Sequence, residues 1–157
     1  MIINHDLDKS MKLVCDLKER LKVDAKQVEL AQALTLNPDK PLLGLKGSLG
    51  LFGSHEWWES IEKGVMPVCI MQGAIVRAYV AGKDRNGSSP NDMIEVLLED
   101  GSVCHDGIYT NDKSDVRLFV PGARVALAYI YDELKAQSAS DGGINYARVV
   151  LEMAVSI

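Results

Sequence analysis

Apolar residues near the N-terminus recur at intervals of four and three, the spacing that places side chains on one face of a helix. Asp6 or Asp8 is placed to cap the start of that helix, since a short carboxylate accepts hydrogen bonds from the first free backbone N–H groups. The pattern predicts a helix whose buried face is formed by five residues: Leu7, Met11, Val14, Leu17 and Leu21.

A second helix is predicted directly after the first. Asp24 and Gln27 have the spacing of a capping box. An apolar stripe follows, and the segment NPDKP at 37–41 ends the helix, because proline and the residue before it leave helical geometry. The stripe consists of Val28, Ala31 and Leu34.

The apolar period changes from helical to two-fold at Pro67. Residues 67–82 read as one long strand, in which Gly73 indicates a bulge or a sharp bend. Residues 92–110 read as a hairpin, because alternating apolar residues precede Asp100-Gly101, a pair suited to the positive φ values of a tight turn.

Two more strands complete the pattern. The first follows a Pro121-Gly122 turn, and the second follows a polar loop near residue 140. In the last strand Arg148 and Glu152 are expected to point outward, away from the apolar face. The expected inward residues are Val125, Leu127, Tyr129 and Tyr131 in one strand, and Ala147, Val149, Leu151, Met153 and Val155 in the other.

Together these elements predict an α+β fold. N-terminal helices pack on a small antiparallel β-barrel or a strongly bent sheet of five to six strands, with an OB-like topology as one option. The predicted segments are a helical part (1–40), a Gly-rich linker with a short Trp-bearing helix (41–66) and a barrel-like part (67–157). They are expected to make one structural unit.

Composition narrows the class of protein. The 157 residues are 47% hydrophobic and 25% charged, which is typical of a globular chain. The net charge of −5 disfavours nucleic acid and anionic membranes as partners. The N-terminus lacks the pattern of a signal peptide, no apolar run is long enough to cross a membrane, and the three cysteines are odd in number. We therefore expect a bacterial, cytoplasmic protein with reduced thiols.

The Gly-rich run at 44–53 and the helix after it have the most unusual local composition. The run lacks the spacing of a phosphate-binding loop, and the glutamates of the helix would repel a polyanion, so we expect a flexible turn there. Ser54 is placed to cap the helix and Gly64 to end it. Neighbouring helical residues point about 100° apart. Trp57 and Trp58 therefore divide between core and surface, or one of them anchors a partner beside Glu56 and Glu59.

Catalytic and metal chemistry have little support. Cys104 and His105 are neighbours on a strand and point to opposite faces, and no local spacing brings two metal ligands together. Carboxylates at strand ends, such as Asp106 and Asp132, are expected to be solvated. We predict no cofactor, no metal site and no catalytic residue, and a small enzyme without a legible motif stays as the second alternative.

The first alternative is an OB-like protein that binds single-stranded nucleic acid. A basic and aromatic strand face would serve that function. Glutamates on the same strands instead favour cross-strand ion pairs on a solvated face. The residues of that face are Arg77, Tyr79, Tyr109, Arg117, Arg124 and Arg148.

The leading hypothesis is a non-catalytic protein-binding domain, for example an acidic inhibitor or an immunity-type protein that neutralises a basic partner protein. It follows from the negative charge, the small size and the acidic helix that carries Trp57, Trp58, Glu56 and Glu59. The oligomeric state does not follow from the sequence.

Overall fold

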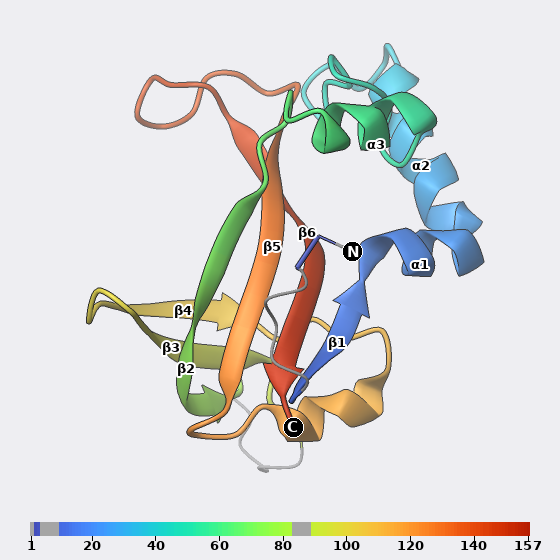
Figure 1. Cartoon of the computed structure of the whole chain (residues 1–157). Helices are drawn as coiled ribbons and strands as arrows, with labels where there is room; N and C mark the ends of the chain where they lie inside the picture. The colour runs from blue at the N-terminus through green and yellow to red at the C-terminus, as the bar shows by residue number, and fades with distance from the viewer. Residues whose placement is uncertain (1, 4–9, 83–88) are drawn as a thin grey trace. The chain divides into compact units, whose positions relative to one another are not determined.

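The computed structural model of the chain describes residues 2–3, 10–82 and 89–157, and it has an α+β fold (Figure 1). The three α-helices precede five of the six strands, as predicted in outline, but one strand that was not predicted comes before them. In chain order the elements are β1 (Met11–Asp16), α1 (Leu17–Val23), α2 (Ala25–Leu36), α3 (His55–Glu62), β2 (Cys69–Tyr79), β3 (Met93–Leu98), β4 (Val103–Gly107), the 3₁₀ helix η1 (Lys113–Leu118), β5 (Arg124–Glu133) and β6 (Tyr146–Ser156).

The chain forms two compact units that alternate along the sequence. The first consists of residues 1–16, 70–128 and 151–157, and the second of residues 17–69 and 129–150. The division therefore passes through β5 and β6, and neither unit coincides with one of the segments predicted at 1–40, 41–66 and 67–157. That these segments make one structural unit stays a prediction.

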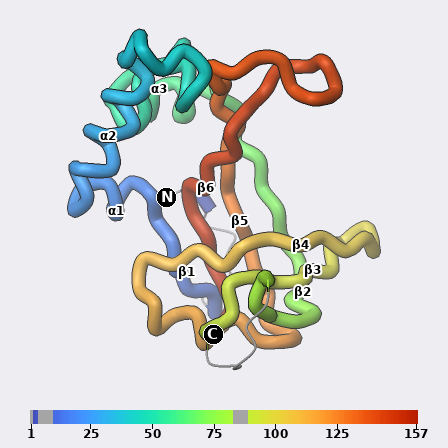
Figure 2. The backbone as a smooth tube through the Cα atoms, turned by 180° about the vertical axis from the view of Figure 1, so that it is seen from behind, coloured from blue at the N-terminus to red at the C-terminus, as the bar shows by residue number. Residues whose placement is uncertain are grey.

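Six strands form one sheet in the order β1-β6-β5-β2-β3-β4. The strand pairs β1–β6, β2–β3 and β3–β4 are antiparallel. In both backbone views the β3–β4 hairpin runs across the direction of β2 (Figures 1 and 2). Because β1 and β4 lie at the two ends of the order, the described strands do not close into a barrel. They form one six-stranded sheet, which agrees in strand number with the other predicted option, a sheet of five to six strands.

The predicted first helix is wrong over residues 11–16, which form β1. Val14 and Cys15 are buried in this strand, and its residues pair with β6 from Met11↔Ser156 to Asp16↔Glu152. Pairing with an apolar strand overrides a helical spacing that only a few residues support. The helical geometry begins at Leu17, and Asp6, Leu7 and Asp8 lie outside the described residues.

The predicted second helix is confirmed as α2. Asp24 is its N-cap, and its side chain accepts a hydrogen bond from the Gln27 N–H at 3.3 Å. The helix ends at Leu36, one residue before the C-cap Asn37 and two before Pro38, as the proline predicts.

The long strand predicted at 67–82 is β2, but its irregularity lies elsewhere. The register with β3 shifts between Ile75 and Arg77, two residues beyond Gly73. Gly73 is required for a different reason, because a Cβ there would lie 2.3 Å from the Leu97 carbonyl oxygen. The glycine thus permits close backbone approach, while the bulge turns the strand farther along.

The predicted hairpin is confirmed as β3–β4. Ile94 and Val96 are fully buried, and Gly101 has φ +84° in the turn. The Leu98 N–H donates a hydrogen bond to the Ser102 carbonyl at 2.9 Å, which closes this turn.

The core of the first unit is built around β5 and β6, which are buried on both faces in that unit. Glu152 was predicted to point outward and is instead buried with 4% exposure. Its carboxylate accepts hydrogen bonds from the Ile2 and Ile3 N–H groups at 2.7 to 2.8 Å, which satisfies the buried charge. The buried apolar residues in these strands are Val125, Ala126, Leu127, Ala128, Leu151, Met153, Ala154 and Val155.

Candidate partner-binding surface

Helix α3 begins and ends at the residues that the sequence predicts. The Ser54 side chain accepts a hydrogen bond from the Trp57 N–H at 3.2 Å. At the other end Gly64 has φ +76°, and its N–H donates to the Ile61 carbonyl at 3.1 Å. Both ends of the helix are therefore capped, which gives hydrogen-bond partners to backbone groups that a helix end would otherwise leave unpaired.

Trp57 lies in the core of the second unit. It is 0% exposed, and its indole Nε1–H donates a hydrogen bond to Asp132 Oδ2 at 2.9 Å. Its ring also contacts Phe52, with centroids 5.0 Å apart, and Ile61 one turn later is buried as well. Trp57 thus attaches α3 to β5 and offers no surface to a partner.

Asp132 was expected to be solvated and is instead 4% exposed. Burial raises the pKa of its carboxyl, while the hydrogen bond from Trp57 acts in the opposite direction. The net result is a raised pKa. Asp106, also expected in solvent, is 7% exposed.

Trp58 is only partly buried, so the two tryptophans divide between core and surface, one of the two predicted arrangements. Its ring meets that of Trp57 edge-on, with centroids 4.8 Å apart. The Lys18 Nζ lies 5.4 Å from the Trp58 ring centroid and 3.9 Å from a Glu62 carboxylate oxygen. An ammonium group from α1 therefore already covers part of the exposed indole.

Glu56 and Glu59 differ in their exposure and in their ion pairs. Glu56 is exposed, and it forms no ion pair with another residue that the structure describes. Glu59 forms an ion pair with Lys63, and His55 lies 3.5 Å from its carboxylate. The hydrogen bond from Lys63 lowers the pKa of Glu59. The negative charge that a partner can meet directly is therefore that of Glu56.

The glycines between α2 and α3 are packed against these helices. Gly44, Gly47, Gly50 and Gly53 all have positive φ values. A Cβ at Gly50 would lie 2.6 Å from the Trp57 backbone nitrogen. Glycine is thus needed in this run for positive φ angles and for close packing against the helices. This packed loop is found where a flexible turn was expected.

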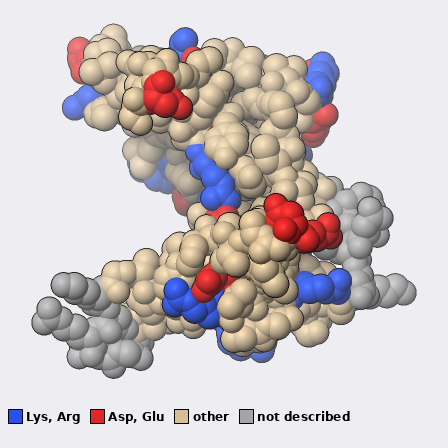
Figure 3. Space-filling view, turned by 90° about the vertical axis from the view of Figure 1, so that its left-hand side faces the viewer, with Lys and Arg blue, Asp and Glu red and all other residues tan. Residues whose placement is uncertain are grey.

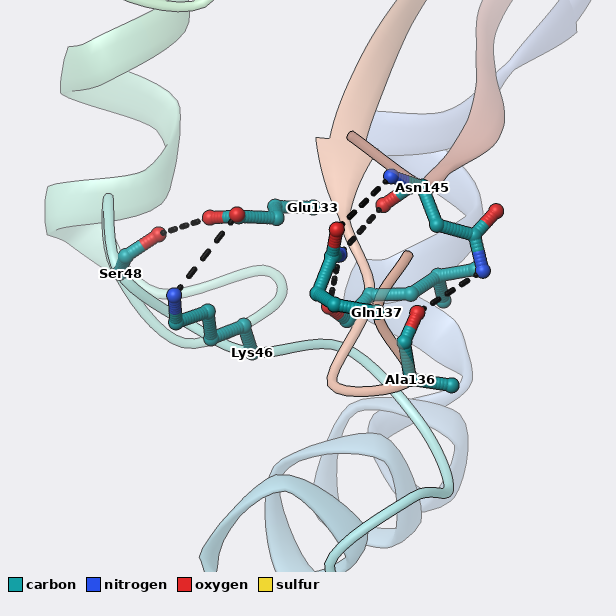
Figure 4. A network of polar contacts seen from close by, with 7 residues as sticks. Lys46, Ser48, Glu133, Ala136, Gln137 and Asn145 are labelled. Carbon is teal, nitrogen blue, oxygen red and sulfur yellow. Dashed lines mark hydrogen bonds and ion pairs between the residues drawn. The ribbon is translucent and has the colours of Figure 1, made fainter. Parts of the chain in front are cut away.

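Polar contacts fix the same loop to β5 (Figure 4). The Glu133 carboxylate lies 3.7 Å from Lys46 Nζ and accepts a hydrogen bond from the Ser48 hydroxyl at 3.4 Å. The Lys46 N–H donates to the Glu133 carbonyl at 2.9 Å. Two positions of this loop are therefore connected to the end of β5.

The connection from β5 to β6 is held by its own amide side chains (Figure 4). Gln137 accepts a hydrogen bond from the Asn145 N–H and donates to the Asn145 carbonyl, both at 3.0 Å. The Asn145 side chain donates to the Ala136 carbonyl at 2.9 Å. These bonds define the backbone just before Tyr146.

An open pocket of about 480 Å³ lies in the second unit. Tyr131 and Tyr146 form part of its wall, although they are 48% and 46% exposed. Tyr131 meets Tyr129 edge-on, and the Arg148 guanidinium lies 4.3 Å from the Tyr129 ring centroid. Burial raises the pKa of Tyr129, with a further contribution from Tyr131. The lining residues are Pro67, Cys69, Tyr131 and Tyr146.

The basic and aromatic residues of the nucleic-acid alternative all belong to the first unit except Arg148. Arg77 pairs with Glu95 at 2.6 Å, the cross-strand ion pair predicted from the sequence. Arg77 and Arg148 belong to different units. On the face in Figure 3, Lys and Arg side chains alternate with Asp and Glu in a surface that is mostly uncharged. That arrangement does not form the basic stripe that follows a phosphate backbone.

Two further features, a cluster of metal-binding side chains and a membrane-spanning helix, are both absent from the residues that the structure describes. In that part of the chain no three His, Cys, Asp or Glu side chains are arranged to hold a metal ion. None of its helices combines the length and the apolar composition needed to cross a bilayer.

Comparison with known families identifies the class of protein. The family model described as Immunity protein RhsI2 matches residues 11–156, which is nearly the whole chain. The chain belongs to the RhsI2 immunity protein family. An immunity protein acts without catalysis, by binding a partner protein that is a toxin, so the predicted protein-binding function is confirmed and the OB-like alternative is not favoured. A search of curated proteins finds no match to this chain.

Sequence reasoning found α3 but missed the residues that contact it from afar. Asp132 was read as a strand-end carboxylate, because nothing local shows that an indole 75 positions away lies beside it. Tyr131 was predicted to point inward with Val125 and Leu127, yet it is nearly half exposed. The signal available in the sequence was a residue with a polar hydroxyl, Tyr131, within an otherwise apolar strand.

Proposed function

We propose that this member of the RhsI2 family neutralises a basic toxin by binding it with the solvent-facing side of α3, in the bacterial cytoplasm. Glu56 and the exposed part of Trp58 make the direct contacts from the two flanks of the helix, and Glu59, which lies between them on the side opposite Trp57, adds charge. Trp57 acts indirectly, because its burial fixes the orientation of the helix.

The observation that carries this proposal is the family match over residues 11–156. The net charge of −5 favours a basic partner, since opposite net charges speed encounter. Cys15, Cys69 and Cys104 are thiols, which suits a reducing compartment.

The geometry of α3 supports its role as a contact surface. Both ends are capped, and the hydrogen bond between Trp57 and Asp132 ties its inner face to β5. A helix held in this way loses little conformational freedom on binding. Trp58 supplies aromatic area on one flank of the helix and Glu56 supplies an exposed charge on the other, since residues two apart on a helix do not face each other. Tryptophan is common among residues that dominate interfaces.

The test begins with affinity purification of the tagged chain from its own cells at low salt. The partner is identified by mass spectrometry, purified and expressed in a test host with and without the chain. We expect a stoichiometric partner whose toxicity the wild-type chain relieves. Absence of such a partner, or a partner whose toxicity persists, would overturn the proposal.

The site is tested with Glu56→Lys and Trp58→Ala, and Glu29→Lys is the matched control because Glu29 is an exposed glutamate on α2. Each site variant should weaken toxin binding about tenfold or more, while the control binds as the wild type does. Circular dichroism and thermal unfolding verify that the variants fold. Equal affinities for all three folded variants would exclude α3 as the contact surface.

A further inference from the structure

We propose that the open pocket formed by Pro67, Cys69, Tyr131 and Tyr146 is a second toxin contact, which takes an arginine or lysine side chain of the toxin. The proposal rests on the proposed function, because it assumes the same basic partner. It concerns a surface separate from the four residues of α3 discussed above.

The first argument is the exposure of large aromatic side chains. Tyr131 and Tyr146 are 48% and 46% exposed, with ring centroids 6.2 Å apart at an interplanar angle of 59°. Both side chains line the open pocket of about 480 Å³, so a ligand in it can reach them. Tyrosine is enriched among the residues that carry binding energy at interfaces.

Exposed leucines on and after α2 make a competing apolar surface. Leucine is under-represented among interface residues that dominate affinity, and nothing about this surface indicates the chemistry of an occupant. The tyrosine pocket is therefore the better-supported contact. The leucines concerned are Leu30, Leu36, Leu42 and Leu43.

The second argument identifies the ligand as a cation. The faces of aromatic rings attract cations, and arginine is the commonest partner of this kind in proteins. The same tyrosine cluster already binds one, because the Arg148 guanidinium lies 4.3 Å from the centroid of Tyr129. Tyr129 is in edge contact with Tyr131, so the ring that holds this guanidinium adjoins a lining residue of the pocket without lining it. The net charge of −5 adds attraction at longer range.

The third argument is that the backbone beside the pocket is held in place. Asn145, which precedes Tyr146, exchanges hydrogen bonds with Gln137 and donates to Ala136. Glu133, two residues after Tyr131, is tied to Lys46 and Ser48. A site whose backbone is already ordered binds with a smaller entropy loss.

The first experiment uses a defined probe and does not need the toxin. Tetra-arginine is titrated into the full chain while the aromatic carbon-bound proton signals of Tyr131 and Tyr146 are followed by NMR, with tetra-glutamate as the control peptide. We expect both tyrosine signals to shift with tetra-arginine only. Unmoved signals, or equal shifts with both peptides, would overturn the proposal.

The second experiment uses the purified toxin identified above. Tyr131→Leu and Tyr146→Leu remove the ring face but keep apolar bulk, Tyr131→Phe keeps the ring face, and Tyr109→Leu alters an exposed tyrosine outside the pocket. The two pocket leucine variants should lose about tenfold in affinity, whereas Tyr131→Phe and Tyr109→Leu should bind as the wild type does.

The outcomes separate the two proposals. If the leucine variants bind normally while Glu56→Lys weakens binding, the pocket is excluded and the role of α3 stands. If no toxin binds the wild-type chain, the proposed function fails, and the tetra-arginine titration alone decides whether the pocket takes a cation. Thermal unfolding of each variant shows whether a loss of binding comes from a loss of fold.

Discussion

At the scale of single residues, the contact between Trp57 and Asp132 has the clearest physical consequences. An indole N–H and a carboxylate are both buried, and each satisfies the other over 2.9 Å. The hydrogen bond does not fully offset the cost of burying the charge, because the pKa of Asp132 is raised. The protonated carboxyl is therefore favoured more in the folded chain than in the unfolded one.

This raised pKa predicts how stability depends on pH. Between the unfolded pKa, about 4, and the higher folded pKa, the folded state binds more protons, so the contribution of Asp132 to stability falls as pH rises. Asp132→Asn keeps an acceptor for Trp57 and removes the charge. The free energy of unfolding of this variant, relative to wild type, should rise from about pH 4 to about pH 8 in urea titrations.

The matched variant Asp132→Ala leaves the Trp57 N–H without an acceptor. It should be less stable than Asp132→Asn by about 1 to 3 kcal/mol at every pH in that range, because both variants lack the titrating carboxyl and differ only in the acceptor for Trp57. A difference between Asp132→Asn and wild type that does not change with pH would contradict the prediction.

At the scale of elements, α3 depends on a close approach of the chain before it. Gly50 has φ +115°, and its position leaves no room for a Cβ beside the backbone of Trp57. The capping residues Ser54 and Gly64 could be predicted from the sequence, because a cap acts over three or four residues. The packing of Gly50 against the start of α3 could not be predicted, because the two come together only when the loop folds.

Gly50→Ala should therefore destabilise the chain by more than the usual cost of a non-glycine residue at positive φ. Gly64→Ala is the control, because Gly64 has a positive φ as well, +76°, but nothing lies within 4 Å of the added Cβ. We expect about 1 kcal/mol for Gly64→Ala and about 3 kcal/mol or more for Gly50→Ala, measured by urea unfolding. Equal losses for the two variants would show that Gly50 matters only for its φ angle.

At the scale of the whole molecule, function depends on the surface and on charge. The chain has a net charge of −5, and as an RhsI2 immunity protein it binds a protein partner. Long-range attraction acts on the encounter, whereas packing at the proposed contacts, α3 and the tyrosine pocket, would act on the lifetime of the complex. These two contributions respond differently to salt.

The association rate constant with the purified toxin should accordingly fall by about tenfold between about 50 mM and about 500 mM NaCl, because salt screens exposed charges. The dissociation rate constant should change much less. Surface plasmon resonance or stopped-flow fluorescence measures both. An association rate constant that does not vary with salt would mean that the toxin is not basic where it meets this chain.

Features that depend on neighbours in the sequence were predictable here. The caps of α2 and α3, the end of α2 before Pro38 and the Asp100-Gly101 hairpin all arise from contacts within a few residues. The acidic charge and the lack of local catalytic motifs also led to a protein-binding, immunity-type function, which the family match supports.

Features that depend on distant segments required the folded chain. Residues 11–16 have helical spacing but form a strand, because pairing with β6 buries Val14 and Cys15. The burial of Glu152 depends on the chain start, since its carboxylate meets the amides of Ile2 and Ile3 about 150 residues away. Local preferences amount to tenths of a kcal/mol per residue, whereas burial of one large apolar side chain contributes about 1.5 to 3 kcal/mol. Where the two disagree, tertiary burial decides the structure.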